Sequence, residues 1–152
     1  MATTIANFIC VFIIVLAAQA TVILLSIRYR TYIPVIVPWN IHKTTTAGMT
    51  LAGIIIVINI NYMKYAGFKW NVIKKTVYHE YRHVWQMVYH TKTYLWWVRH
   101  PEIYKRMYRN SICSIERDAG MFGRYLGRVN QEHLILKYDS LWLETNLIDK
   151  KD

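Results

Sequence analysis

Two histidines and a glutamate, His79, Glu80 and His83, form the pattern H-E-x-x-H. On a helix, residues four apart share one face with Cβ atoms about 6 Å apart, so both imidazoles can reach one tetrahedral metal ion such as Zn²⁺. Glu80 lies about 100° round such a helix from His79, which fits a general base beside the metal better than a third ligand. A shuffled chain of this composition would contain the pattern roughly once in a hundred cases, so the motif needs support from the rest of the chain.

The distribution of charge supports a special role for Glu80. The net charge is +10 over 152 residues, yet Glu80 is the only acidic residue before Pro101. A buried ion pair with Lys or Arg is the alternative role, and the flanking histidines favour a metal over it. The excess of basic residues indicates an anionic partner, such as lipid headgroups or nucleic acid, or serves solubility alone.

The N-terminal segment predicts a membrane anchor. Residues 5–27 carry no charge, and as a helix they would be about 34 Å long, enough to cross a hydrocarbon core of about 30 Å. Arg28 and Arg30 follow, and the positive-inside rule places the body on the cytoplasmic side. We therefore predict a single-pass transmembrane anchor with a basic flank at residues 1–30 and one domain at residues 31–152.

Two other interpretations of this segment remain open. Ala18-Gln19-Ala20 fits the cleavage site of a signal peptide, which would leave the body secreted or periplasmic. The absence of Lys and Arg before the apolar run, and its continuation past that site, favour the anchor. A buried core helix is the least favoured interpretation at this length.

The following segments predict an α+β domain with a short antiparallel sheet. Residues 28–37 indicate a first strand, at a sheet edge because of its prolines. Residues 39–48 indicate a loop. The apolar, β-branched residues 49–60 favour a strand or hairpin, with a second membrane segment as the alternative. Residues 61–69 indicate a connection.

Two helices complete the predicted domain. The first covers residues 72–90 with Asn71 as its N-cap, and it places Glu80 on a buried stripe. The stripe consists of Ile73, Val77, Glu80, Val84 and Val88. The second helix covers residues 110–126 after a cap at Asn110. Its three glycines, Gly120, Gly123 and Gly127, would allow another element to approach closely.

A catalytic zinc site needs a third protein ligand and an open position. The downstream candidates are His90, His100, Glu102, Glu116, Asp118, Glu132 and His133. The extended pattern H-E-x-x-H-x-x-G-x-x-H is excluded, because Gln86 and Tyr89 stand where it needs Gly and His. Glu116 is the favoured ligand, because it borders an apolar helix face beside small residues. A surface ion pair is the alternative for Glu116, and Asp118 could instead orient a ligating histidine.

His79-Glu80-x-x-His83-x-x-Gln86, followed by Glu116-x-x-Ala119, resembles the zincin metallopeptidases of the gluzincin type. The nearest likeness is to the small single-domain predicted peptidases of phages and bacterial injection systems. The resemblance covers residues 49–126. It implies zinc on His79, His83 and Glu116, with Glu80 as general base, and a strand before the motif helix that binds substrate backbone.

The resemblance also implies a mechanism. Zinc would lower the pKa of its bound water, and Glu80 would accept the proton and pass it to the leaving nitrogen. A further donor would help zinc to stabilise the oxyanion. Tyr125, His100 and His133 are the candidates for this donor, and the sequence does not rank them.

The basic and aromatic residues 91–109 admit three partners. They could contact a lipid surface, line a substrate cleft or bind nucleic acid, and the neighbouring anchor favours lipid and disfavours nucleic acid. The overall prediction is a membrane-anchored zinc peptidase that acts on a peptide or protein near a membrane. The alternatives are an inactive structural membrane or virion component of the same fold, and a basic-aromatic protein that binds a membrane surface or nucleic acid.

Overall fold

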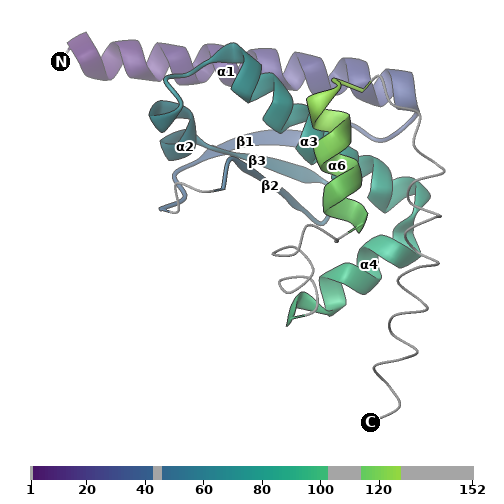
Figure 1. Cartoon of the computed structure of the whole chain (residues 1–152). Helices are drawn as coiled ribbons and strands as arrows, with labels where there is room; N and C mark the ends of the chain where they lie inside the picture. Colours follow the sequence, from purple (N-terminus) through teal and green to yellow (C-terminus); the bar gives the residue numbers. More distant parts are fainter. Residues whose placement is uncertain (1, 43–45, 103–113, 128–152) are drawn as a thin grey trace.

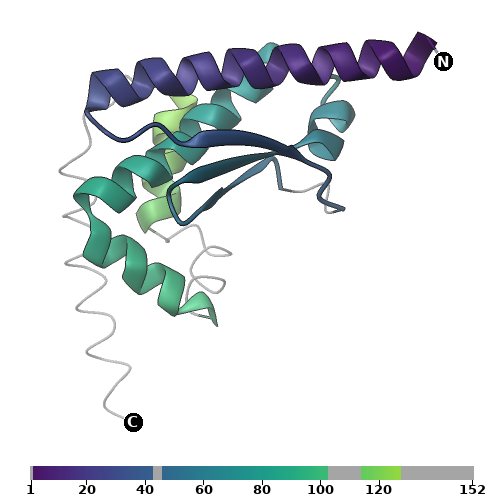
Figure 2. The same ribbon diagram turned by 180° about the vertical axis from the view of Figure 1, so that it is seen from behind.

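The computed structural model of the chain describes residues 2–42, 46–102 and 114–127. It shows an α+β arrangement in which α3 lies between a three-stranded sheet and α6 (Figures 1 and 2). The elements are α1 (Ala2–Tyr29), β1 (Val35–Trp39), β2 (Gly48–Leu51), β3 (Ile55–Asn59), α2 (Ile60–Tyr65), α3 (Trp70–Tyr89), α4 (Thr91–Arg99) and α6 (Ser114–Arg124).

The sheet has the strand order β1-β3-β2. β2 and β3 form the predicted hairpin, whose turn contains Ala52 and Gly53 at φ values of 50° and 71°. β1 lies at an edge, as its proline Pro38 predicts. The prediction of a purely antiparallel sheet is wrong, because β1 pairs with β3 in parallel. The reason is that β3, the most buried strand, takes the central position and so separates β1 from β2.

The helices differ from the predictions in three places, and a fourth prediction lies outside the described residues. α3 begins at Trp70 with Lys69 as N-cap, so Asn71 lies inside the first turn and is not the cap. A short helix, α2, occupies the predicted connection, and the side chain of Asn59 caps it by accepting a hydrogen bond from the Asn61 N–H. Residues 91–99, the first part of the basic and aromatic segment, form helix α4. The predicted cap Asn110 lies outside the described residues, and α6 is described from Ser114.

α3 carries the centre of the core. Its apolar stripe packs against the sheet on one side and against α6 on the other, so the motif helix is held on both faces. The fully buried members of this core include Ile56, Ile58, Ile73, Val77, Tyr81, Val84 and Phe122. Helix α3 is therefore the rigid element on which the H-E-x-x-H residues stand.

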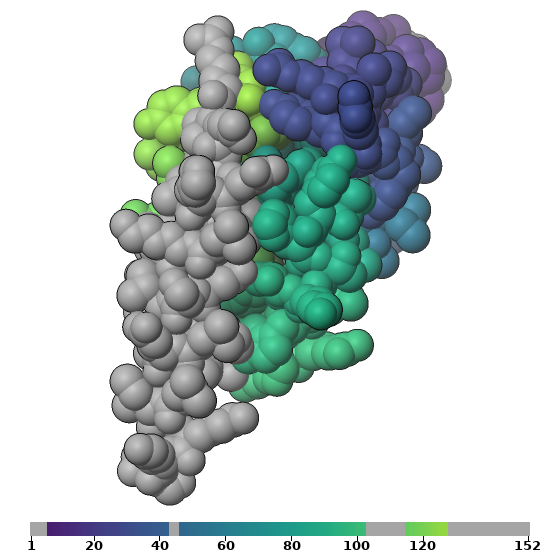
Figure 3. Space-filling view, turned by 90° about the vertical axis from the view of Figure 1, so that its right-hand side faces the viewer, coloured from purple at the N-terminus to yellow at the C-terminus, as the bar shows by residue number. Residues whose placement is uncertain are grey.

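α1 is a single apolar helix that is long and apolar enough to cross a membrane. Part of one face belongs to the core: Ile14, Ala18, Val22 and Leu25 pack with residues of α3 and the sheet. The side chain of Gln19 donates to the carbonyl of Pro34 and accepts from the N–H of Ile36, which ties α1 to β1. Figure 3 shows the blue end of α1 and the green α4 at opposite ends of the molecule.

Candidate metal centre

Three side chains from two helices converge on one point. His79 Nε2 lies 3.2 Å from Glu116 Oε2, and His83 Nε2 lies 3.3 Å from Glu116 Oε1. One potential ligand atom from each residue falls within 4.8 Å of the others, so this group could hold a metal ion. The two histidines come from α3 and the carboxylate from α6, which brings together the three residues that the sequence analysis selected as ligands.

A glycine allows the two helices to approach closely. A Cβ atom at Gly123 would stand 2.9 Å from the Lys75 carbonyl oxygen and 3.1 Å from the Cβ of His79. Gly123 lies seven residues, or about two turns, after Glu116 on the same side of α6. Ala119 lies between them and is fully buried. Of the three glycines predicted to allow close approach, Gly123 does so against α3, whereas a Cβ at Gly120 would meet no atom within 4 Å.

The orientation of His83 is fixed by Gln86. His83 Nδ1 lies 2.9 Å from the side-chain oxygen of Gln86, which can only accept, so Nδ1 carries the proton and donates. This leaves Nε2 of His83 as the nitrogen that faces Glu116 and is available to a metal. The Gln86 amide is itself fixed, since its nitrogen donates to the Ile115 carbonyl at 2.9 Å and to Asp118 at 2.8 Å.

Behind Gln86 lies a buried ion pair. Arg82 donates twice to Asp118, at 2.7 and 3.1 Å, and the two side chains are 3% and 1% exposed. The guanidinium also lies 3.6 Å from the centre of the Trp85 ring, in a cation–π contact. The sequence analysis considered Asp118 as a direct partner of a ligating histidine. The structure shows instead that Asp118 reaches His83 through Gln86.

The electrostatics of the group favour a cation. Burial disfavours the charged form of His83, but the carboxylates of Glu116 and Glu80 outweigh it and raise the pKa of His83 from 6.5 to about 9. Burial also disfavours the carboxylate of Glu116, but His83 and His79 outweigh it and hold the Glu116 pKa well below its usual value of 4.5. The site therefore stabilises a positive charge between the imidazoles and the carboxylate, which a proton or a metal ion can supply.

Glu80 lies on the buried stripe, as predicted, and its side chain is held from the sheet. It is 6% exposed, and the hydroxyl of Thr50 lies 2.9 Å from both its Oε2 and its backbone carbonyl oxygen. Gly48 permits this approach of β2, because a Cβ there would stand 2.9 Å from the Cγ of Glu80. Within the part of the chain that the structure describes, no Lys or Arg forms an ion pair with Glu80.

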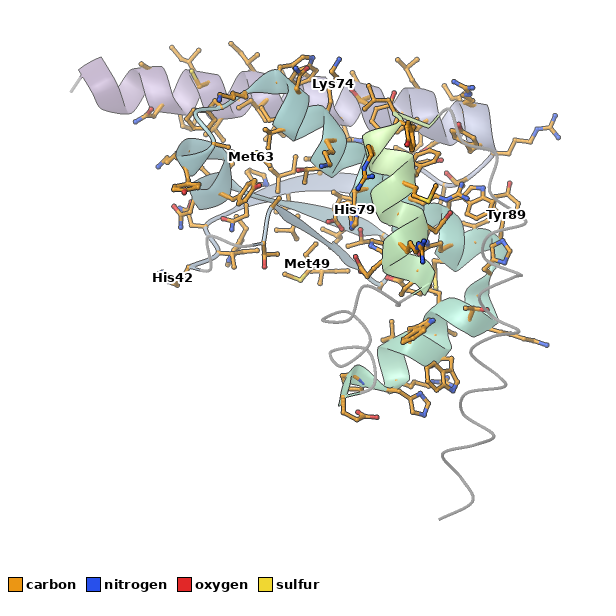
Figure 4. The ribbon with its side chains drawn as sticks, in the orientation of Figure 1. His42, Met49, Met63, Lys74, His79 and Tyr89 are labelled. Carbon is orange, nitrogen blue, oxygen red and sulfur yellow. The ribbon has the colours of Figure 1, made fainter. Side chains whose placement is uncertain are left out.

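Glu80 and the three candidate ligands line one cleft with a volume of about 730 Å³. Its walls are β2, α3 up to His83, α4 and the start of α6. His79 and Met49, which both line the cleft, are labelled in Figure 4. The remaining lining residues are Thr46, Ala47, Gly48, Thr50, Tyr62, Val72, Lys75, Thr76, Tyr94, Trp97, Val98, Pro101 and Ile115. The cleft thus joins the charged group to a largely apolar wall.

An edge of the sheet borders this cleft. β2 is an outer strand, and Asn59 donates to the carbonyl of Ala47 at 3.0 Å. Hydrogen-bonded pairs alternate along an antiparallel ladder, so the backbone groups of Gly48 and Thr50 point away from β3. Both residues line the cleft. The cleft therefore offers free strand edge beside Glu80.

Two of the three predicted oxyanion donors do not line the cleft, and the third lies outside the described residues. Tyr125 is half exposed near the end of α6, His100 stacks on Trp96, and neither residue lines the cleft. His133 lies outside the described residues. Tyr94, which the sequence analysis did not select, lines the cleft with its ring centre 6.3 Å from that of His83.

Tyr94 carries its proton at all physiological pH values. Burial, followed by the charge of Glu80, raises the pKa of the Tyr94 hydroxyl to about 12. The available sequence signal was the spacing of Tyr94 and Trp97, which are three residues apart and are the two buried residues of α4. This spacing indicates the inner face of α4. It was not recognised in the sequence because basic residues are interspersed with the aromatic ones.

The other ligand candidates among the described residues do not belong to the group. His90 packs on Trp85, with ring centres 5.0 Å apart, and Glu102 is exposed. Glu132 lies outside the described residues, as does His133.

Comparisons with protein-family models, curated proteins and solved structures find no match to this chain. The resemblance to zincins therefore remains a prediction from the residues of the motif, and the structure adds a group of three side chains that could hold a metal ion.

Proposed function

We propose that the protein is a zinc-dependent peptidase. The observation that carries the proposal is the convergence of His79, His83 and Glu116 at a cleft in which Glu80 is buried and forms no ion pair with a described Lys or Arg. Two imidazoles and one carboxylate form a ligand set found in catalytic zinc sites, which leaves a position open for water. This donor set supports zinc over magnesium or calcium, which prefer oxygen ligands.

Zinc bound there would supply Lewis-acid activation of a water molecule and of the scissile carbonyl. Glu80 is positioned to accept a proton from water in the cleft and to return it to the leaving nitrogen. The hydroxyl of Thr50 holds Oε2 of Glu80, so Oε1 is the oxygen left to exchange the proton. We assign the stabilisation of a developing oxyanion to the protonated hydroxyl of Tyr94, which lines the cleft.

The strand edge supports a peptide as the substrate. An extended peptide can add to a free sheet edge through backbone hydrogen bonds, with its side chains entering pockets on either side. The outward-facing backbone groups of Gly48 and Thr50 would place such a peptide against the candidate metal site. The apolar wall of Tyr94, Trp97 and Ile115 would accept an apolar side chain of that peptide.

The location forms part of the proposal. α1 is long and apolar enough to enter a membrane, and Arg28 and Arg30 are exposed directly at its end. Basic residues at such a position favour the anionic cytoplasmic leaflet. We therefore place the peptidase at the cytoplasmic face of a membrane, where it would act on a protein or peptide.

Metal analysis joined to peptide hydrolysis tests the proposal. We expect about one zinc per wild-type chain and loss of zinc from Glu116→Ala and His83→Ala. Glu80→Gln should keep its zinc and lose at least about a hundredfold in hydrolysis of a peptide library. Glu102→Gln, which changes an exposed carboxylate outside the cleft, is the matched control and should behave as wild type.

Two outcomes would contradict the proposal in different ways. A wild-type chain without stoichiometric metal would remove the metal centre itself. Stoichiometric zinc in a wild-type chain whose peptide hydrolysis does not exceed that of Glu80→Gln would indicate that the chain does not catalyse the reaction and that the ion serves as a cross-link between α3 and α6. In that case the protein would be an inactive structural component that keeps the site.

A further inference from the structure

Helix α1 has two apolar faces with different surroundings. One face, from Ile14 to Leu25, packs into the core. The opposite face consists of large apolar side chains that are 37% to 73% exposed: Phe8, Ile9, Phe12, Ile13, Leu16, Ile23, Leu24 and Ile27. At 100° per residue these side chains occupy about half of the helix circumference, and the buried face lies opposite them. The exposed face runs almost the whole length of the helix.

The packing of α1 prevents it from crossing a bilayer with the body in its observed place. Only the residues before Ile14 extend free of the core, and this part is about 18 Å long, against a hydrocarbon core of about 30 Å. A full crossing would draw the β1 edge and the side chain of Gln19, which is bonded to it, into hydrocarbon. Unpaired backbone groups at a sheet edge are not tolerated there.

Charge identifies the partner of the exposed face. In the described part of the chain, three of the four acidic residues, Glu80, Glu116 and Asp118, belong to the candidate metal centre and its supporting network. Exposed Arg28 and Arg30 stand at one end of α1. Two copies of a chain with a net charge of +10 repel each other, whereas an anionic lipid surface attracts each copy.

We propose that α1 lies in the plane of an anionic membrane, with its outer apolar face in the acyl-chain boundary and the body of the protein on its inner face. Interfacial helices normally carry a polar face of their own. Here the folded domain takes the place of that polar face. The protein is then bound to one leaflet and does not span the bilayer.

This orientation determines what the cleft can reach. The cleft is bounded by β2, α4 and α6, and α4 lies at the opposite end of the molecule from α1 (Figures 1 and 3). With α1 in the membrane, the cleft opens into water. The orientation itself does not depend on the proposed function. If the protein is a peptidase, the orientation implies that its substrates are water-exposed segments of proteins and not membrane-spanning segments.

Spin labels on the full-length chain test the orientation. Labels are attached at Phe8→Cys, Leu16→Cys and Leu24→Cys, one at a time, with Cys10 and Cys113 replaced by Ser. The probe is a vesicle of phosphatidylcholine with phosphatidylglycerol. We expect equal depths at the three positions, measured by the accessibility of each label to oxygen and to a water-soluble nickel complex. Met49→Cys, in the cleft, should stay accessible to nickel only.

Depth distinguishes the possible orientations because positions 8 and 24 are about 24 Å apart along the helix. A label at position 16 that lies deeper than those at 8 and 24 would overturn the proposal in favour of a spanning helix. Labels at position 16 that approach each other in a dimer, without entering lipid, would overturn it in favour of a second copy. Neither result depends on metal or hydrolysis, so it leaves the test of the proposed function separate.

A charge series tests the choice of lipid. Combined Arg28→Gln and Arg30→Gln should weaken binding to the anionic vesicles about 25-fold, since each basic residue near such a surface contributes about a fivefold factor. The matched control is Lys92→Gln with Arg99→Gln, which removes two exposed charges from α4. The control should bind as wild type, and equal weakening by both pairs would contradict the proposed orientation.

Discussion

Gln86 controls the ligand His83 without touching the metal position. Its side-chain oxygen accepts a hydrogen bond from the Nδ1–H of His83. Its side-chain nitrogen donates to Asp118 and to the carbonyl of Ile115, and these bonds fix its orientation. A partner of this kind sets the tautomer and ring orientation of a metal-binding histidine. The catalytic quality of the site is therefore expected to depend on residues that never meet the substrate.

Gln86→Leu tests this dependence. The substitution removes the acceptor of His83 Nδ1, and we expect zinc affinity to fall about 10- to 100-fold. Competition with a chromophoric chelator measures the change. Thr50→Val is the matched control, since Thr50 contacts Glu80 and none of the three candidate ligands: zinc affinity should stay constant while peptide hydrolysis falls. Unchanged affinity in Gln86→Leu would refute the role of Gln86.

The charge pair in the site gives the metal-free protein a particular pH dependence. The pKa of His83 is raised from 6.5 to about 9, so its contribution to stability is complete below pH 6.5 and is lost as the pH rises through 9. The pKa of Glu116 is lowered, so its contribution is present above pH 4.5 and is lost as the pH falls through its folded value. Their joint contribution is greatest between pH 4.5 and 6.5.

The expected measurement is the difference in unfolding free energy between the metal-free wild type and metal-free Glu116→Gln. This difference should decrease steadily from pH 6.5 to pH 9. Urea unfolding at each pH measures it. The comparison cancels the titration of groups that the variant does not affect. A difference that is constant with pH would show that His83 and Glu116 are not paired.

At this scale the sequence was sufficient to select the three side chains that converge and the buried Glu80, but not the residues that support them. Glu116 could be chosen because small residues follow it on an apolar helix face. Arg82 and Asp118 are 36 residues apart and look like ordinary surface charges in sequence. Their burial depends on the way α3 and α6 pack together, which no local pattern of residues specifies.

Two glycines of helix α6 differ in their distance from α3, and substitutions at the two positions test how closely the helices pack. Gly123→Ala would place a Cβ 2.9 Å from the backbone oxygen of Lys75, so one helix must shift. We expect a loss of about 1–3 kcal/mol in unfolding free energy and weaker zinc binding. Gly120→Ala meets no atom within 4 Å and should stabilise the protein by about 0.5–1 kcal/mol, because alanine favours helix.

Urea unfolding of the two variants side by side provides the measurement. Equal effects of Gly120→Ala and Gly123→Ala would contradict the close packing at Gly123. Zinc binding provides a second readout, since a shift of α6 would move Glu116 away from the two histidines. Gly120→Ala should leave zinc binding unchanged.

Elements were predictable from sequence where the signal was local. The hairpin, the motif helix and the edge position of β1 follow from β-branched runs, apolar periodicity and proline. The parallel pairing of β1 did not follow, because it depends on which strand occupies the centre of the sheet. The inner face of α4 was not predicted, because Tyr94 and Trp97 stand among basic and other aromatic residues that show no clear apolar periodicity.

The whole molecule joins a candidate metal centre to an apolar helix through one core. Hydropathy identified α1 correctly as apolar, but it does not distinguish a lipid neighbour from a protein neighbour. The packing of Ala18 and Val22 in the core makes the distinction for one face of the helix. Binding of an ion to the folded protein alone should therefore stabilise α1, α3 and α6 together.

Removal of zinc tests this coupling. Zinc at about 100 times its dissociation constant should raise the unfolding free energy by about 2.7 kcal/mol relative to the chelated protein. The change is measured by thermal unfolding followed by circular dichroism. Glu116→Ala should show no stabilisation by zinc. Equal stabilisation of this variant would indicate that the ion binds elsewhere.

The hydrogen bonds of Gln19 also bear on how the protein matures. A leader peptidase that cut after Ala20 would remove Ile14 and Ala18 from the core and leave the N–H of Ile36 without its side-chain acceptor. A chain beginning at residue 21 is therefore expected to lack a cooperative unfolding transition. During synthesis α1 leaves the ribosome first, and the rest of the domain is expected to complete its core when it docks on that helix. Delivery to the membrane and assembly of the candidate metal site would then be successive steps of one event.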